Sequence, residues 1–137
     1  MALTAAVKRT IVGESQIVSI ASNGDDTYYE GALLVIDANG YLNVPAGAAT
    51  DIPAGAYTGR QGQALAVASG SHDELEMERG LVWVPFSGAA QGDVGELFYP
   101  SDDSTMTQTA GSMKYAVMCV GFKTGYVLLD YRNILYV

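Results

Sequence analysis

The chain has 137 residues, enough for one domain with a core of its own, so it needs neither a disulfide nor a structural metal to fold. Seven Lys and Arg stand against fifteen Asp and Glu, and the net charge of −8 argues against binding to the phosphate backbone of nucleic acids. No apolar stretch approaches the ~20 residues needed to span a bilayer, and the first residues do not have the pattern of a secretory signal. We therefore expect a soluble, unprocessed chain.

Residues 1–12 are expected to form an N-terminal arm or an edge strand, and residues 13–137 a single β domain. The first segment contains the only adjacent basic pair, Lys8-Arg9, followed by Thr10-Ile11-Val12, whose β-branched side chains favour extended backbone. Gln16–Ile20 is a second possible strand. Asn23–Asp26 is expected to be a turn, because Asn and Gly tolerate the positive φ of tight turns.

The segment 31–44 has the pattern of a β-hairpin. Leu33–Ile36 is apolar on both faces, which predicts a strand covered on both sides. Asp37–Gly40 reverses the chain, and Tyr41–Val44 alternates as a half-buried strand does. The following residues 45–56 are rich in Pro, Gly and Ala. Because such residues make poor cores and poor strand ladders, this stretch is expected to be a surface loop.

Two further strands are expected on either side of a glycine. Gln63–Ala68 is a strand, and Glu74–Glu78 alternates strictly, so that Leu75 and Met77 share one face and three glutamates share the other. Like charges along one face must be in water or opposite cations. A turn is expected at Arg79-Gly80, before a strand at Leu81–Val84.

The rest of the chain is predicted as a glycine-containing loop followed by short strands. The strands expected there are, in order, Leu97–Tyr99, residues 105–107, Met113–Phe122 and Tyr126–Leu129. No window of 11 residues has a helical stripe of apolar residues. The fold class is therefore mainly β, a compact antiparallel β-sandwich or barrel with at most one short helix.

Few residues suggest catalysis or metal binding. His72 lies in a polar turn and is expected to be exposed, and no serine has the glycine flanks of a nucleophile elbow. Asp25-Asp26 and Asp102-Asp103 lack the alternating oxygen positions of a calcium loop. Cys119 lies in an apolar run and is expected in the core. We expect no catalytic residue, no cofactor and no metal, and a protein that is not an enzyme.

Several residues suggest contacts between protein chains. The nine tyrosines are many for this length, and Tyr28, Tyr29 and Tyr131 lie in polar sequence, where tyrosine often serves interfaces. The apolar C-terminus, residues 133–137, would be adhesive if bare, so it is expected to be a paired strand or an interface element. The candidates for self-assembly are Tyr131, Ile134, Leu135, Tyr136 and Val137.

The succession of these segments resembles the head decoration, or capsid cement, proteins of tailed bacteriophages, in particular their small β-rich family. The matching segments are, in order, Gly31–Val35, Ile52–Gly55, Gly80–Pro85, Gly92–Tyr99, the threonines at 105, 107 and 109, and the hairpin Ala116–Leu129. Two segments depart from the pattern of the family. Gly59–Gln63 stands where a shorter turn is expected, and Asp130–Val137 extends past the usual end.

This resemblance implies a structural protein that binds the exterior of the assembled phage head and stabilises it against internal DNA pressure. The implied partners are the major capsid protein and further copies of the chain, in a homotrimer, with no nucleic acid and no membrane. The implied location is the outer surface of the capsid in the virion, after synthesis in the host cytoplasm. Lys8, Arg9, Thr10, Ile11 and Val12 are the candidate capsid contacts, because an extended basic segment can add a strand to a partner's sheet edge.

Two other functions fit the same pattern. A carbohydrate-binding or adhesive β-sandwich module could use Trp83 and the tyrosines as its binding platform. A structural component of the phage tail is the other alternative.

Overall fold

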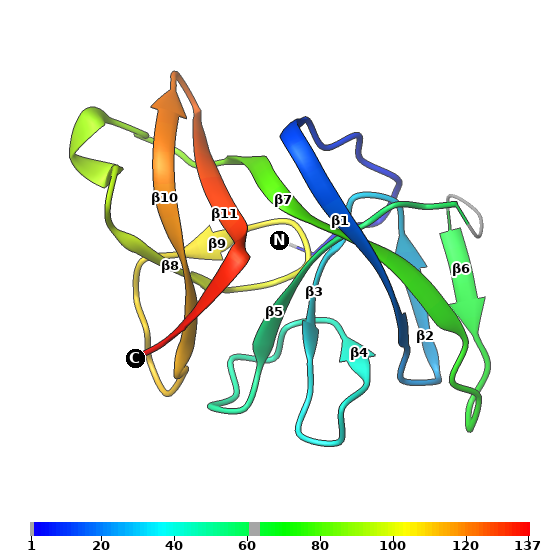
Figure 1. The fold of residues 1–137 in the computed structure, drawn as a ribbon. Helices are drawn as coiled ribbons and strands as arrows, with labels where there is room; N and C mark the ends of the chain where they lie inside the picture. Colours follow the sequence, from blue (N-terminus) through cyan, green and yellow to red (C-terminus); the bar gives the residue numbers. More distant parts are fainter. Residues whose placement is uncertain (1, 61–63) are drawn as a thin grey trace.

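A curled antiparallel sheet forms a half-barrel in the computed structural model, which describes residues 2–60 and 64–137 (Figure 1). The elements are β1 (Ile11–Ala21), β2 (Asp26–Tyr29), β3 (Leu33–Ile36), β4 (Leu42–Asn43), β5 (Ile52–Tyr57), β6 (Ala64–Val67), β7 (Glu74–Pro85), the 3₁₀ turn η1 (Gln91–Asp93), β8 (Leu97–Pro100), β9 (Met106–Thr107), β10 (Tyr115–Lys123) and β11 (Tyr126–Tyr136). The predicted mainly β class is confirmed. No helix in the described part of the chain has the length and apolar character to cross a bilayer.

The central strand is β7, which is paired along both edges. The main sheet has the order β4-β3-β5-β7-β11-β10-β8-β9, while β2 and β6 form a separate pair. On one edge, β1 pairs with β7 from Glu74 to Val82. On the other edge, β5 pairs with Met77 and Glu78, and β11 takes over from Leu81 to Pro85. Two strands that diverge from each other therefore share one edge of β7.

The buried side of β7 changes halfway along the strand. Leu75 and Met77 are fully buried in one hydrophobic cluster, whereas Val82 and Val84 are fully buried in another. Because side chains alternate along a strand, odd and even residues lie on opposite faces of the sheet. The molecule therefore has two cores, one on each face of β7. The alternation predicted for Glu74–Glu78 is confirmed by the burial of Leu75 and Met77.

β3 separates the two cores. Leu33 belongs to the cluster around Val82 and Phe98, and the adjacent Leu34 belongs to the cluster around Tyr28 and Met77. Both leucines are 1% exposed. The prediction of a strand covered on both sides is confirmed, and its reason is that a separate core packs against each face.

The prediction of a surface loop over residues 45–56 is wrong for its second half. Ile52–Tyr57 is β5, and residues 53–57 are buried between its neighbours. Small residues suit this position because the strand is enclosed on both faces. A side chain at Gly55, whose φ is 107°, would collide with the carbonyl of Glu78. The loop before β5 is shaped by the buried Asp51, whose Oδ2 accepts N–H bonds from Ala46 (3.0 Å) and Ala48 (3.2 Å).

The predicted turn at Arg79-Gly80 is also wrong, because β7 continues through both residues. Gly80 is buried, and a Cβ there would lie 2.8 Å from the Cβ of Ser15. β1 is irregular at this point, with a register shift between Val12 and Gln16. The glycine therefore allows the close approach of two strands and does not reverse the chain.

The C-terminal hairpin is confirmed, and it is longer than expected. β11 continues to Tyr136, and its last residues pair with the start of β10 through Leu135 and Tyr136. The C-terminal run is therefore a paired strand. Cys119 is fully buried, as predicted. The interface role suggested for Tyr28 and Tyr131 does not fit their positions, since both side chains lie in the core and are at most 1% exposed.

Candidate binding surface

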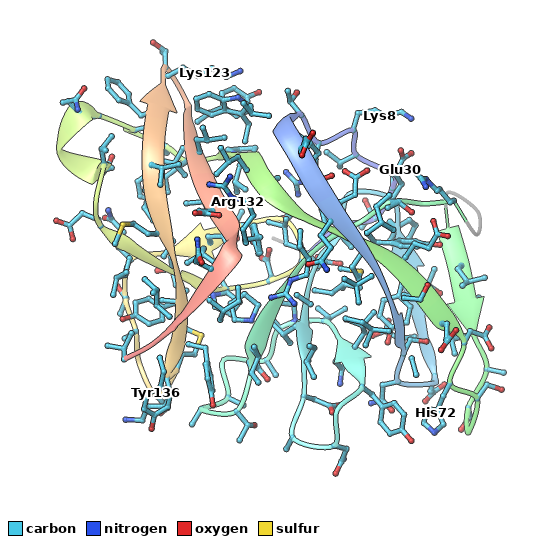
Figure 2. The ribbon with its side chains drawn as sticks, viewed as in Figure 1. Lys8, Glu30, His72, Lys123, Arg132 and Tyr136 are labelled. Atoms are coloured by element: carbon cyan, nitrogen blue, oxygen red, sulfur yellow. The ribbon has the colours of Figure 1, made fainter. Side chains whose placement is uncertain are left out.

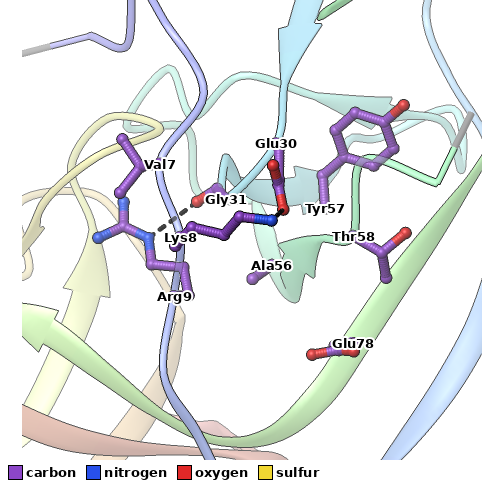
Figure 3. Close-up of a pocket in the computed structure, with 9 residues that line it drawn as sticks. All are labelled: Val7, Lys8, Arg9, Glu30, Gly31, Ala56, Tyr57, Thr58 and Glu78. Carbon is purple, nitrogen blue, oxygen red and sulfur yellow. Dashed lines mark hydrogen bonds and ion pairs between the residues drawn. The ribbon is translucent and has the colours of Figure 1, made fainter. Parts of the chain in front are cut away.

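The N-terminal segment lies along its own domain before β1 begins. The Leu3 N–H donates to Asp103 Oδ1 (2.7 Å), and the Val7 N–H donates to the carbonyl of Glu30 (2.7 Å). Arg9 Nε donates to the carbonyl of Gly31 (2.9 Å), as Figure 3 shows. Residues 2–10 are therefore anchored by main-chain and side-chain bonds at three points.

Gly31 makes this anchoring possible. Its φ is +84°, and a Cβ at this position would collide with the carbonyl of Val7. A cavity of about 140 Å³ lies under the crossing, and the Lys8–Glu30 ion pair (2.9 Å) lies on its border (Figure 3). Such a volume is below that of ordinary ligand pockets. It is a feature of how the segment packs and is not a candidate site.

Asp102 and Asp103 lie beside this segment, and their pKa values are shifted in opposite directions. Burial raises the pKa of Asp103, which is 3% exposed. Burial also opposes ionisation of Asp102, but hydrogen bonds to its carboxylate, among them those from the N–H and hydroxyl groups of Ser104 and Thr105, outweigh it and lower the pKa of Asp102 to about 2. The ionised Asp102 therefore holds the turn that carries Asp103.

We expect Asp102→Asn to lower the free energy of unfolding by about 1 kcal/mol near neutral pH, because bonds to a charged acceptor are stronger than bonds to an amide. A carboxyl whose pKa is lowered by folding contributes stability above its ordinary value of 3.8, and this contribution is lost as the pH falls towards 2. The difference between wild type and variant should therefore shrink between about pH 4 and pH 2. Urea unfolding across this range measures it. A difference that is constant with pH would contradict the assignment.

Around the second half of β7, from Leu81 to Pro85, one face of the sheet is left uncovered by the neighbouring strands. Directly paired residues share a face, and the pairs here are Val12 with Leu81 and Trp83 with Leu128. The opposite face carries the buried core residues Val82 and Leu129. We call the uncovered side the outer face, and define it by Val12, Arg79, Leu81, Trp83, Leu128 and Arg132.

A hollow lies at each end of the outer face. The arginine hollow, of about 530 Å³, is lined by Glu14, Ser15, Gln16, Arg79 and Arg132. The irregular part of β1 and the middle of β11 form its sides. Arg132 is held there by Asp130, which is 7% exposed and accepts from Arg132 Nε at 2.9 Å. This bond lowers the pKa of Asp130.

The second hollow, of about 210 Å³, is aromatic and basic. We call it the aromatic hollow; its lining includes Lys8, Arg9, Trp83, Pro85, Lys123 and Tyr126. The ammonium of Lys123 lies 4.5 Å from the centre of the Trp83 ring and 5.0 Å from that of Tyr126. Figure 2 shows Lys123 and Lys8 towards the same end of the molecule, and Arg132 beside the middle of β11.

Charge is segregated onto this part of the surface. The two hollows are lined by five of the seven Lys and Arg of the chain, and by only one of its fifteen acidic residues, Glu14. The two other basic residues, Arg60 and Lys114, line neither hollow. An acidic protein therefore presents one basic face with an apolar centre.

The structure brings together only part of the predicted N-terminal contact set. Lys8 and Thr10 line the aromatic hollow, and the Thr10 carbonyl accepts the N–H of Trp83 (3.1 Å). Val12 is 38% exposed on the outer face. Arg9 is half-buried, and burial lowers the pKa of its guanidinium. Ile11 packs against the core around Val82.

The predicted C-terminal contact set is divided between core and surface. Tyr131 is a core residue, and burial raises the pKa of its hydroxyl. Ile134 and Leu135 are half-buried. Tyr136 and Val137 are 73% and 55% exposed, and the Tyr136 ring packs edge-on against Tyr115 at 5.2 Å. Only Tyr136 and Val137 thus offer a large surface to another molecule.

Several contributors to the outer face and its hollows were not predicted as site residues from the sequence, among them Arg79, Leu81, Lys123, Tyr126, Leu128 and Arg132. His72, which was considered for chemistry, is exposed, stacks on Tyr41 at 4.0 Å and lies 2.9 Å from the carbonyl of Ser22. Among residues 2–60 and 64–137, no three His, Cys, Asp or Glu side chains are placed to hold a metal ion.

Comparison of the sequence with protein-family models, with curated proteins and with solved structures finds no match.

Proposed function

We propose that this chain is a structural protein that decorates the exterior of a tailed-bacteriophage head and stabilises the assembled capsid. The resemblance of its segments to capsid decoration proteins supports the proposal. The single structural observation that carries it is the outer face, an uncovered sheet face with an apolar centre and basic hollows at both ends. Such a face suits a protein partner, here the major capsid protein.

A decorating protein stabilises a capsid by mass action. It binds the assembled lattice and not the separated subunits, so its binding free energy is added to the free energy of assembly. No reaction is required, and rigidity is useful. The two cores on either side of β7 provide such rigidity.

The proposal includes a homotrimer, and the exposed C-terminus is its candidate contact. Tyr136 and Val137 are apolar and exposed beside Tyr115. Specific interfaces bury at least about 1,000 Å². We expect sedimentation to find trimers at tens of micromolar protein, and Tyr136→Ser with Val137→Ser to shift the population towards monomer. A wild-type chain that stays monomeric at this concentration would contradict the trimer.

The direct test is to add the purified protein to phage heads that lack it. We expect saturable binding, regular density on the outside of the heads in cryo-electron micrographs, and DNA release at a higher temperature than from bare heads. Absence of binding at micromolar protein would overturn the proposed function. Density confined to the tail would support the alternative of a tail component.

The carbohydrate-binding alternative is less well supported by the same residues. Stacking of a sugar on Trp83 needs a free ring face, and the ammonium of Lys123 lies 4.5 Å from the centre of that ring. A glycan array distinguishes the two functions, because specific binding to one class of glycan would favour the carbohydrate-binding module.

A further inference from the structure

The two hollows lie along one stretch of β7. Arg79 belongs to the arginine hollow, and Trp83 belongs to the aromatic hollow with Lys123 over its ring. The two β7 residues are four positions apart, which corresponds to about 13 Å at the ~3.3 Å rise of a strand. The outer face thus offers a positive charge at each end of this stretch of β7.

The surface between the hollows is apolar. Leu81 and Leu128 are half-buried on the outer face, and Val12 is 38% exposed beside them. In the described part of the chain, Leu81 and Leu128 belong to neither hydrophobic core, whereas the other face of the same strands packs on the core. A ligand that fits this surface needs an apolar group at its centre.

Arg79 and Lys123 are the charges available to a partner. Arg132 is bound to Asp130, and Lys8 to Glu30. Arg79 and Lys123 make no ion pair with any residue that the structure describes. Each can therefore gain a carboxylate without losing one of its own.

We infer that the outer face binds an extended acidic segment of a partner protein, in which two carboxylates flank an apolar residue in the pattern acidic–x–apolar–x–acidic. In an extended segment, residues i, i+2 and i+4 point to one side, and the first and last are about 13 Å apart. The carboxylates then meet Arg79 and Lys123, while the apolar side chain packs on Leu81 and Leu128.

This inference rests on the proposed function for the identity of the partner, which is the major capsid protein. It adds the surface and the chemistry by which that partner is recognised. Because the chain carries a net charge of −8, an acidic partner is repelled by most of its surface and attracted by the outer face. The charges thus orient the encounter, and binding should weaken as salt is raised.

The test uses a labelled heptapeptide with the sequence Ser-Glu-Thr-Phe-Thr-Glu-Ser, whose binding is measured by fluorescence anisotropy. Trp83 is the only tryptophan of the chain, so its own fluorescence should change in the same titration. The double variant Arg79→Gln with Lys123→Gln is expected to weaken binding at least about tenfold. Arg60→Gln with Lys114→Gln makes the same change in net charge away from the outer face, and should leave binding within about twofold of wild type.

Several outcomes would overturn the inference. One is that the two double variants weaken peptide binding equally. Another is that a peptide with lysines in place of the glutamates binds as tightly. The third is that the fluorescence of Trp83 does not change during the titration. Melting temperatures of both variants check that the fold is kept, and Lys123→Gln alone replaces the first pair if Arg79→Gln unfolds the chain. If the Arg79→Gln, Lys123→Gln variant no longer forms a trimer but still binds the peptide, the outer face is the contact with a second copy of the chain. This result too would overturn the inference.

Binding to phage heads separates the inference from the proposed function. If wild type and the Arg79→Gln, Lys123→Gln variant bind heads equally, the inference fails and the proposed function stands. If wild type binds the peptide but not the heads, the proposed function fails and the acidic-segment site stands. We expect wild type to bind both, and the variant to lose both.

Discussion

Gly31→Ala is expected to lower the free energy of unfolding by about 3 kcal/mol, since it combines two costs. A side chain at φ +84° costs about 1 kcal/mol in backbone strain. The added methyl group also displaces the Val7 carbonyl, so the bonds from Val7 to Glu30 and from Arg9 to Gly31 are disturbed at about 1 kcal/mol each. Urea denaturation of wild type and variant measures the total.

Gly40 provides a matched control for this prediction. Its φ is also +84°, but a Cβ there would meet nothing within 4 Å. Gly40→Ala should therefore report the backbone strain alone, about 1 kcal/mol. The difference between the two variants is the free energy with which the N-terminal segment is held. Equal effects of the two substitutions would mean that the segment contributes nothing to stability.

Leu33→Ala and Leu34→Ala are each expected to cost about 3 kcal/mol, because each removes a fully buried side chain from a packed core. These adjacent residues belong to different cores, which nevertheless share β3, β5 and β7. We therefore expect each variant to unfold in one transition. Circular dichroism and Trp83 fluorescence, followed together during heating, should give the same midpoint.

Two separate midpoints in either leucine variant would contradict this expectation. They would show that the two cores melt as independent units and that β7 is only a connection between them. The conservative Leu34→Met serves as a control, because a swap of similar volume should cost less than about 1.5 kcal/mol.

Local periodicity predicted most of the strands correctly. The alternation of Glu74–Glu78 and the doubly apolar Leu33–Ile36 give direct information about which faces are covered. The hairpin around Thr124-Gly125 was equally predictable from the sequence, because a glycine turn separates two apolar runs. In each of these cases the informative pattern is a short continuous stretch of sequence.

The wrong predictions share one physical cause. Each of the two segments contains a glycine, Gly55 in β5 and Gly80 in β7, against which a segment distant in sequence packs closely. The contact of Gly80 with Ser15 and that of Gly55 with Glu78 exist only after the strands have paired. From the sequence alone, a glycine that permits such an approach cannot be distinguished from a glycine that turns the chain.

The candidate site was the least predictable part. Arg79, Lys123 and Arg132 lie in different strands and have no common motif. They meet on one face because β7 pairs with β1 on one edge and with β11 on the other. Of the predicted contacts, Lys8, Arg9, Thr10 and Val12 lie at this surface, since β1 continues from the N-terminal segment alongside β7.

The pairing of β7 on both edges has a mechanical consequence. Antiparallel hydrogen bonds run perpendicular to the strands, so tension applied along β7 loads them in shear. Under such tension the bonds to β1, β5 and β11 must yield together and cannot open one after another. Pulling that peels β4 or β9 from the two ends of the sheet would meet only a short ladder. The resistance of the molecule to force should therefore depend on direction, and be greatest along its central strand.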